Sequence, residues 1–148
     1  MIKGGCLCGK IRYEADGESF LAIRCHCRDC QYVSGGESAA VISVVRGALR
    51  VQGEPREYRS KADSGVAVSR SFCADCGTPP FAGNEKDAEV IAIKLGSSTS
   101  HPSSHRPVTY GHHRRNLGIT SIPMRQLFLQ RTLALRQIRY RDGDQAFS

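Results

Sequence analysis

Residues 73–77 read Cys73-Ala74-Asp75-Cys76-Gly77, and a second cysteine pair stands near the start of the chain as Cys6-Leu7-Cys8-Gly9. Closely spaced thiolates on a turn can reach one metal ion at about 2.3 Å, and the glycine after each pair lets the backbone curl around the ion. The remaining cysteines form a third group, Cys25-His26-Cys27-Arg28-Asp29-Cys30. All seven cysteines of the 148-residue chain therefore stand in groups whose spacing suits chelation.

An odd number of cysteines argues against a disulfide framework. Seven thiols cannot all pair within one chain, and neighbouring cysteines in Cys-x-Cys form strained small rings when oxidised. Residues 1–9 lack the apolar core of a secretory signal, and no apolar run approaches the roughly 20 residues of a membrane helix. We therefore expect a cytoplasmic chain whose reduced thiols bind metal.

Seven ligands divide most simply into four and three. A closed zinc site of four thiolates is structural, whereas three protein ligands leave an open position for water or substrate. The 16 residues between Cys8 and Cys25 would also suit a zinc ribbon that joins the first two groups, so spacing alone leaves the division open. The middle group, however, already supplies three ligands, with Cys27 and Cys30 on one face of a helical turn. The two outlying pairs then remain for a four-thiolate site.

Short strands between turns dominate the first hundred residues. Residues 10–15 alternate cleanly, with Ile11, Tyr13 and Ala15 on one face and charged residues on the other. Turns rich in Gly and Ser separate the further candidates. The other predicted strands are 20–24, 39–45, 57–59, 66–72 and 90–95. This pattern predicts a mainly β domain with antiparallel sheets.

The segment after residue 100 differs in character from the rest of the chain. It holds eight Arg and two Asp but no Lys or Glu, and so accounts for most of the net charge of +7. Apolar residues at helical spacing predict a basic amphipathic helix over 121–141, with Ser121 and Pro123 at its start. Such a helix either packs on the domain, which we favour, or binds an acidic surface. Aromatic residues are sparse here, so we expect no nucleic-acid partner, and we expect no membrane partner.

The three cysteine stretches occur in order with distinctive neighbours. They read Gly4-Gly5-Cys6-Leu7-Cys8-Gly9 with Ile11-Arg12-Tyr13, then Cys25-His26-Cys27-Arg28-Asp29-Cys30-Gln31 with Ser34-Gly35-Gly36, then Arg70-Ser71-Phe72-Cys73-Ala74-Asp75-Cys76-Gly77-Thr78. Over about residues 3–107 this pattern resembles the glutathione-dependent formaldehyde-activating enzyme family. The resemblance implies a β-tent of antiparallel sheets with two zinc ions. The structural zinc would be held by Cys6, Cys8, Cys73 and Cys76, and the catalytic-type zinc by Cys25, Cys27 and Cys30.

The resemblance also divides the chain into a zinc-binding β-tent domain, residues 1–107, and an atypical basic tail, residues 108–148. Family members usually continue with a strand and a Pro-Trp segment, whereas this chain has no Trp and turns Arg-rich after Val108. We therefore carry over no contribution from the tail to the active site.

The activity that the resemblance implies is that of a carbon–sulfur lyase, which joins glutathione and formaldehyde or cleaves their adduct. A similar small thiol or aldehyde would suit the same chemistry. Three anionic thiolates leave zinc a weak Lewis acid, so capture of the glutathione thiolate is favoured over polarisation of the aldehyde. The carboxylates of glutathione need cations and backbone donors. The candidates near the metal groups are Arg28 and the loop residues Ser34, Gly35 and Gly36, with Arg24 and Arg70 as further cations.

His26 and Asp29 stand between the predicted ligands of the middle group. His26 could exchange a proton with substrate, but we favour an imidazole turned away, because both neighbours turn toward the metal. Asp29 is expected to bond the amides of its own loop.

The alternative to catalysis is a zinc-dependent binding module or chaperone-like protein of the same fold. Such a module needs only the four-thiolate site. The middle group, Cys25, Cys27 and Cys30, would be superfluous in it and therefore favours an enzyme.

Overall fold

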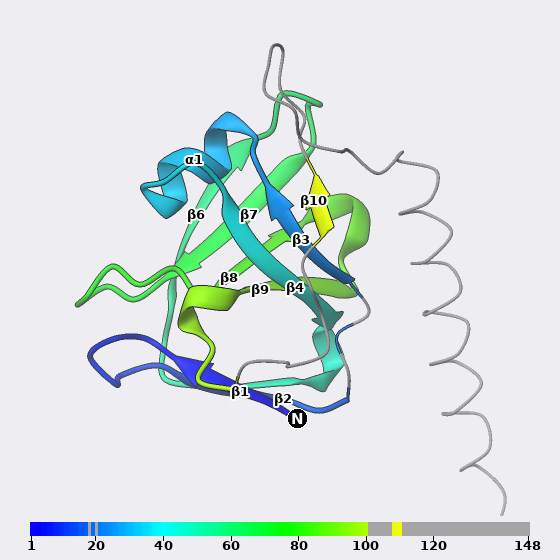
Figure 1. Ribbon diagram of the computed structural model, residues 1–148. Helices are drawn as coiled ribbons and strands as arrows, with labels where there is room; N and C mark the ends of the chain where they lie inside the picture. Colours follow the sequence, from blue (N-terminus) through cyan, green and yellow to red (C-terminus); the bar gives the residue numbers. More distant parts are fainter. Residues whose placement is uncertain (18, 20, 101–107, 111–148) are drawn as a thin grey trace, which may run out of the picture.

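The computed structural model describes residues 1–17, 19, 21–100 and 108–110 (Figure 1). The helix predicted over 121–141 and the Arg-rich part of the tail lie outside these residues. Within the described part of the chain, no helix is long and apolar enough to cross a membrane.

Two sheets form the fold, the smaller at the bottom of Figure 1 and the larger above it. The small antiparallel sheet has the order β1-β2-β5, with β1 (Ile2–Gly5), β2 (Arg12–Ala15) and β5 (Leu49–Gln52). The large sheet has the order β10-β3-β4-β9-β8-β7-β6. Its strands are β3 (Leu21–Cys25), β4 (Ala39–Val45), β6 (Arg56–Lys61), β7 (Ala67–Phe72), β8 (Phe81–Asn84), β9 (Val90–Lys94) and β10 (Val108–Tyr110). Its neighbouring strands are antiparallel except β10, which runs parallel to β3.

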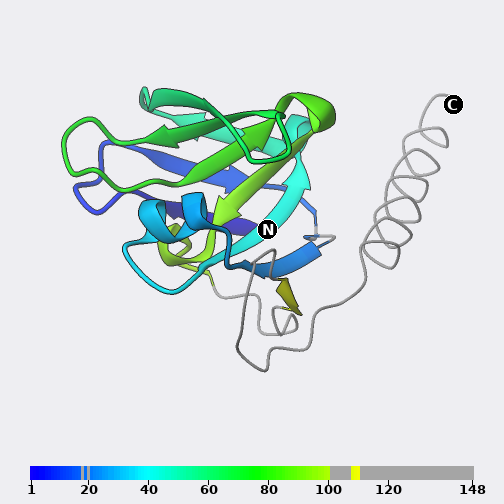
Figure 2. The same ribbon diagram turned by 90° about the horizontal axis from the view of Figure 1, so that it is seen from above.

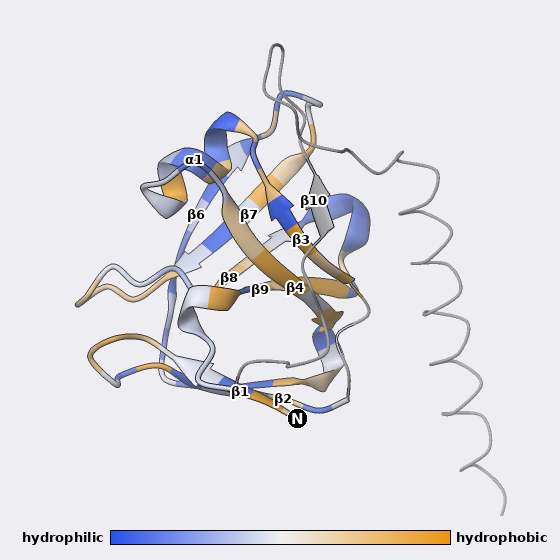
Figure 3. Ribbon diagram, in the orientation of Figure 1, coloured by the Kyte–Doolittle hydropathy of each residue, from blue (hydrophilic) through white to orange (hydrophobic). Residues whose placement is uncertain are grey.

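The core fills the space between the two sheets. Ile42 on β4 and its partner Ile93 on β9 are fully buried in the middle of the large sheet, where Figure 3 shows a hydrophobic centre. From β2, the ring of Tyr13 meets that of Phe81 edge-on, with centroids 5.0 Å apart. The Tyr13 hydroxyl is satisfied by Ser97 Oγ at 3.0 Å, so this aromatic residue joins the two sheets without an unpaired polar atom.

Two residues, Ser97 and Tyr13, lie so close to β1 that position 4 must be a glycine. A Cβ at Gly4 would lie 2.2 Å from the carbonyl oxygen of Ser97 and 2.3 Å from the hydroxyl of Tyr13. The short strand β1 can therefore cover the edge of the core only because position 4 has no side chain.

One α-helix, α1 (Arg28–Ser34), follows β3 directly among the described residues. It ends at Gly35, whose φ of 66° is left-handed and whose amide donates to the Gln31 carbonyl. None of its residues is buried, so the helix lies on the surface of the large sheet. In Figures 1 and 2 it lies on the same side of the molecule as the β1–β2 and β7–β8 loops, which carry the two cysteine pairs. Short 3-10 turns occur at η1 (Arg46–Ala48), η2 (Glu85–Asp87) and η3 (Leu95–Ser97).

The prediction of a mainly β fold with antiparallel sheets is confirmed. The strand predicted at 39–45 has the observed bounds of β4, and the other five predicted strands fall on β2, β3, β6, β7 and β9. The predicted apolar face of Ile11, Tyr13 and Ala15 is buried, with at most 2% exposure. Sequence patterns missed four strands, namely β1, β5 and β8, which are four residues each, and β10, which is three residues long. Two of them contain glycine, which weakens a strand signal.

The domain boundary at residue 107 stays a prediction. The backbone of Val108–Tyr110 pairs with Ile23–Cys25 on β3, so these first three residues of the predicted tail extend the large sheet.

Candidate metal centres

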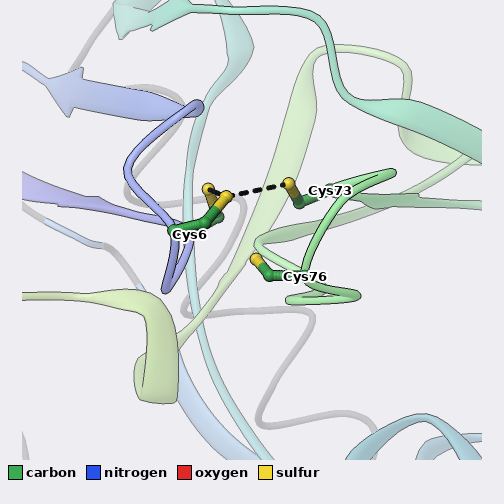
Figure 4. A group of neighbouring side chains, drawn as sticks. Cys6, Cys73 and Cys76 are labelled. Atoms are coloured by element: carbon green, nitrogen blue, oxygen red, sulfur yellow. Dashed lines mark hydrogen bonds between the residues drawn. The ribbon is translucent and has the colours of Figure 1, made fainter.

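Four cysteines from two distant loops meet in one cluster, which we call the four-cysteine cluster: Cys6, Cys8, Cys73 and Cys76. Their sulfur atoms all lie within 4.8 Å of one another. The side chains labelled in Figure 4 point toward a common centre, with Cys6 on the β1–β2 loop and the other two on the β7–β8 loop. Cys6 and Cys73 are buried, whereas Cys8 is exposed. The zinc ribbon that would join Cys8 to Cys25 is therefore not formed.

Each cysteine pair of the four-cysteine cluster lies on a tight turn, as expected from the glycine that follows the pair. Gly9 and Gly77 have φ values of 89° and 71°, which favour glycine. The amide of Gly77 donates to the Cys73 carbonyl at 2.9 Å, and the Gly9 amide to the Cys6 carbonyl at 3.2 Å. The two loops thus form similar knuckles, each with a pair of thiols on one side.

Thr78 links the two knuckles through its hydroxyl. The Leu7 amide donates to Thr78 Oγ1 at 3.1 Å, and Thr78 Oγ1 lies 3.3 Å from Cys76 Sγ. Hydrogen bonds from the side chain and then the backbone of Thr78 lower the pKa of Cys76 to about 5. On the other loop, the Ile11 amide donates to Cys6 Sγ at 3.2 Å. Amide and hydroxyl donors of this kind stabilise thiolates, the form in which cysteine binds metal.

The spacing of the four sulfurs fits a tetrahedral ion. Zinc bound at about 2.3 Å by four sulfurs holds them about 3.8 Å apart. Cys6 Sγ and Cys8 Sγ are 3.4 Å apart, and Cys8 Sγ and Cys73 Sγ are 3.6 Å apart. The cluster can therefore accept an ion of this size with little movement of its side chains.

The second group, Cys25, Cys27 and Cys30, forms a three-cysteine cluster at the start of α1. Its sulfurs also lie within 4.8 Å of one another, and Cys25 Sγ is 3.3 Å from Cys27 Sγ. Cys25 ends β3, Cys27 is the N-cap of α1 and Cys30 lies in its first turn. Among the described residues no fourth His, Cys, Asp or Glu joins this cluster. The division of the seven thiols into four and three is thus found in the structure, whereas their roles as metal ligands stay predictions.

Charge within the three-cysteine cluster is concentrated at one sulfur. The pKa of Cys30 is lowered, chiefly by its hydrogen bond with Cys25 and further by the positive charge of Lys94. That hydrogen bond, together with burial, raises the pKa of Cys25. Burial raises the pKa of Cys27 as well. Cys30 is therefore the thiol of this cluster whose anionic form is favoured.

Asp29 holds α1 onto the large sheet. Its Oδ2 accepts a hydrogen bond from Arg70 Nη2 at 2.7 Å, and Arg70 Nη1 donates to Ser60 Oγ at 2.5 Å. The Arg70 side chain is only 12% exposed. Asp29 thus bonds a distant arginine rather than the amides of its own loop, because α1 places its carboxylate above β7. Arg70, predicted as a cation for glutathione, is already occupied by this pair.

His26 is buried between the ligands but does not belong to the three-cysteine cluster. Among the described residues, neither ring nitrogen lies with the ligand atoms, as expected for an imidazole turned away. Nδ1 is 3.7 Å from Glu37 Oε1, and Nε2 has no hydrogen-bond partner in the described part of the chain.

Three of the four residues predicted to bind glutathione line one hollow of about 430 Å³ on α1, namely Arg28, Gly35 and Gly36. The Arg28 guanidinium lies 4.3 Å from the ring centre of Tyr32, which also lines the hollow. Ser34 does not line the hollow, and its hydroxyl instead accepts from the Gly36 amide at 3.2 Å. Their role in binding stays a prediction.

Sequence reasoning missed two residues that the fold brings to these clusters. Thr78 stands two residues after Cys76, which is the local signal that its hydroxyl could donate to that thiolate. Lys94 has no such local signal, because its place near Cys30 depends on how β9 pairs with β4.

Comparisons with known proteins agree with this architecture. A family model described as glutathione-dependent formaldehyde-activating enzyme matches residues 1–113. No curated protein matches the chain significantly. The crystal structure of a Rhodobacter sphaeroides protein is similar, with a TM-score of 0.55 and 23% identity over 68% of this chain and 91% of that one, which supports the fold alone. Because the family model covers well over half of its length, the chain belongs to the glutathione-dependent formaldehyde-activating enzyme family.

Proposed function

We propose that this chain is a carbon–sulfur lyase that forms or cleaves the adduct of glutathione and formaldehyde, or of a similar small thiol and aldehyde. In the forming direction, the thiolate sulfur attacks the aldehyde carbon and a carbon–sulfur bond forms. The electron pair of the carbonyl bond moves to oxygen, which then takes up a proton. In the reverse direction the same bond breaks and the thiolate leaves.

The three-cysteine cluster is the observation that carries this proposal. Cys25, Cys27 and Cys30 supply three sulfur ligands in the described structure, one fewer than a closed zinc site needs. Zinc held there would bind the thiol of glutathione at its open position and lower the pKa of that thiol. The four-cysteine cluster provides a full ligand set and is proposed as the structural zinc site. This division supports one ion that stabilises the fold and one that takes part in the reaction.

The hollow on α1 is the proposed place for the rest of glutathione. Arg28 offers a guanidinium to a carboxylate, and Gly35 and Gly36 leave the backbone open to close approach. Arg28 directly follows Cys27 in the chain, so the hollow adjoins the turn of α1 that carries two of the thiols.

The family, the clusters and the sequence support further parts of the proposal. We assign the activity to the β-tent domain, residues 1–107, and none of it to residues 108–148. Reduced thiols suit a cytoplasmic location. A binding module of the same fold would have no use for Cys25, Cys27 and Cys30, which makes the enzyme the preferred function.

Calorimetry of glutathione with the zinc-loaded full chain tests the proposal. The native chain should bind glutathione, whereas Cys27→Ser should bind none and retain about one zinc ion per chain. Exchange between free and adduct formaldehyde, followed by NMR, should be faster with the native chain than with the variant. Equal binding and equal exchange for both proteins contradict the proposed site.

A further inference from the structure

The face of the large sheet opposite the core carries a lysine beside the three-cysteine cluster. Residues paired across antiparallel strands share a face, and so do residues two apart along a strand. Cys25 pairs with Ala39 on β4, and Val41, two residues along, pairs with Lys94 on β9. All four residues therefore share one face, on the side of the sheet away from the core, and α1 contacts β4.

Arg70 lies on the same face two strands further along. From Lys94 the face continues through Ala92, which pairs with Ala82 on β8, and Ala82 pairs with Arg70 on β7. Because both residues are alanines, only short side chains lie between Lys94 and Arg70 along this row. Arg70 is held by Asp29 and by Ser60, so its charge is already compensated.

Lys94 has no such partner. Its ammonium makes no ion pair or hydrogen bond in the described part of the chain, and its side chain is only half-buried. It lies on the face of the sheet that carries Cys25, two strands away, so a ligand held at the cluster can extend along this face toward the ammonium.

We infer that Lys94 binds the carboxylate of an acidic thiol ligand at the three-cysteine cluster. The inference rests on the proposed function and assigns one residue to the selection of substrate. A half-buried ammonium gains a charge-assisted hydrogen bond from a carboxylate, whereas a neutral thiol leaves it unpaired. Arg24 does not serve this role, because it neighbours Cys25 on β3 and so faces the opposite side of the sheet. Glutathione, with two carboxylates, belongs to the class of ligand that Lys94 selects.

Two small thiols separate the carboxylate from the thiol in a binding experiment. Calorimetry of the zinc-loaded full chain compares 3-mercaptopropionate, which carries a carboxylate, with 2-mercaptoethanol, which carries none. Lys94→Gln should weaken binding of 3-mercaptopropionate about tenfold, the size expected for a hydrogen bond between charged groups. Binding of 2-mercaptoethanol should be unchanged, which also shows that the variant is folded. Lys94→Arg should retain the preference, and Lys86→Gln, the same change at an exposed site on η2, should behave as the native chain.

The remaining outcomes separate this inference from the proposed function. If Lys94→Gln weakens binding of both thiols equally, or of neither, Lys94 does not bind the carboxylate. In either case the native chain still binds thiols and the proposed function stands. A native chain that binds neither thiol contradicts the proposed function and this inference with it.

Discussion

The hydrogen bond between Asp29 and Arg70 should control how firmly the three-cysteine cluster holds metal. α1 has seven residues, none of them buried, and its N-cap residue Cys27 makes no side-chain capping bond. The helix that carries Cys27 and Cys30 therefore depends on few contacts with the sheet. The 2.7 Å bond from Arg70 is one of them, and it joins α1 to β7.

Asp29→Asn keeps the size of the side chain but removes its charge. The Arg70 guanidinium is 12% exposed and keeps its bond to Ser60, so the change leaves a largely buried cation without a counter-charge. The Asp29 side chain is 40% exposed, and solvent there screens part of the effect. A charged hydrogen bond with one partly exposed partner contributes about 1–2 kcal/mol, which corresponds to a loss of about tenfold in metal affinity at this cluster.

Zinc release to a coloured chelator measures the prediction. The native chain should release zinc in two phases, one from each cluster, and Asp29→Asn should accelerate one phase about tenfold while leaving the other unchanged. Glu57→Gln provides a matched control, because it breaks the exposed pair between Glu57 and Arg59 on β6. Equal acceleration of both phases, or of neither, refutes the role of Asp29 in positioning the cluster.

Three further predictions concern the four-cysteine cluster and the core. Cys73→Ser should abolish cooperative unfolding in thermal circular dichroism, whereas Cys27→Ser should leave a cooperative transition, and the reverse order would contradict the assignment of the structural site. Thr78→Val, which removes the bridge between the knuckles, should speed zinc loss from the four-cysteine cluster several-fold, and an unchanged rate would show that the hydroxyl is dispensable. Tyr13→Phe should lower the free energy of unfolding in urea by about 1 kcal/mol through loss of the bond to Ser97. No change in the urea midpoint would mean that solvent replaces this bond.

Local sequence patterns predicted much of the fold. The alternation of Ile11, Tyr13 and Ala15 predicted one buried face, and the apolar run 39–45 predicted the central strand β4. No such pattern marks strand β1, since Gly4 and Gly5 serve close packing rather than side-chain burial. It forms by pairing with β2, and its glycine at position 4 admits the close approach of Ser97, far away in the chain.

The candidate site likewise has one part that local sequence predicts and one part that it does not. Cysteine spacing indicated that all seven thiols suit chelation, because chelation needs neighbouring thiols on a turn. Their division into four and three came from coordination number and from the resemblance, since spacing alone left it open. The environment of the clusters depends instead on strand register, which local sequence does not specify. Arg70 meets Asp29 only because α1 lies over β7, and Lys94 comes near Cys30 only because β9 pairs with β4. Distant partners of this kind escape any inspection of short motifs.

The four-cysteine cluster joins parts of the chain that are far apart, since Cys8 and Cys73 are 65 positions apart in sequence. An ion at this cluster would act as a reversible cross-link between the two knuckles. By confining the unfolded chain, a link across a loop of that length contributes about 4 kcal/mol of stability, as much as a disulfide of the same span. A chelator would open it where a reductant opens a disulfide. The amount of folded protein would then follow the supply of metal, as long as the four thiols stay reduced.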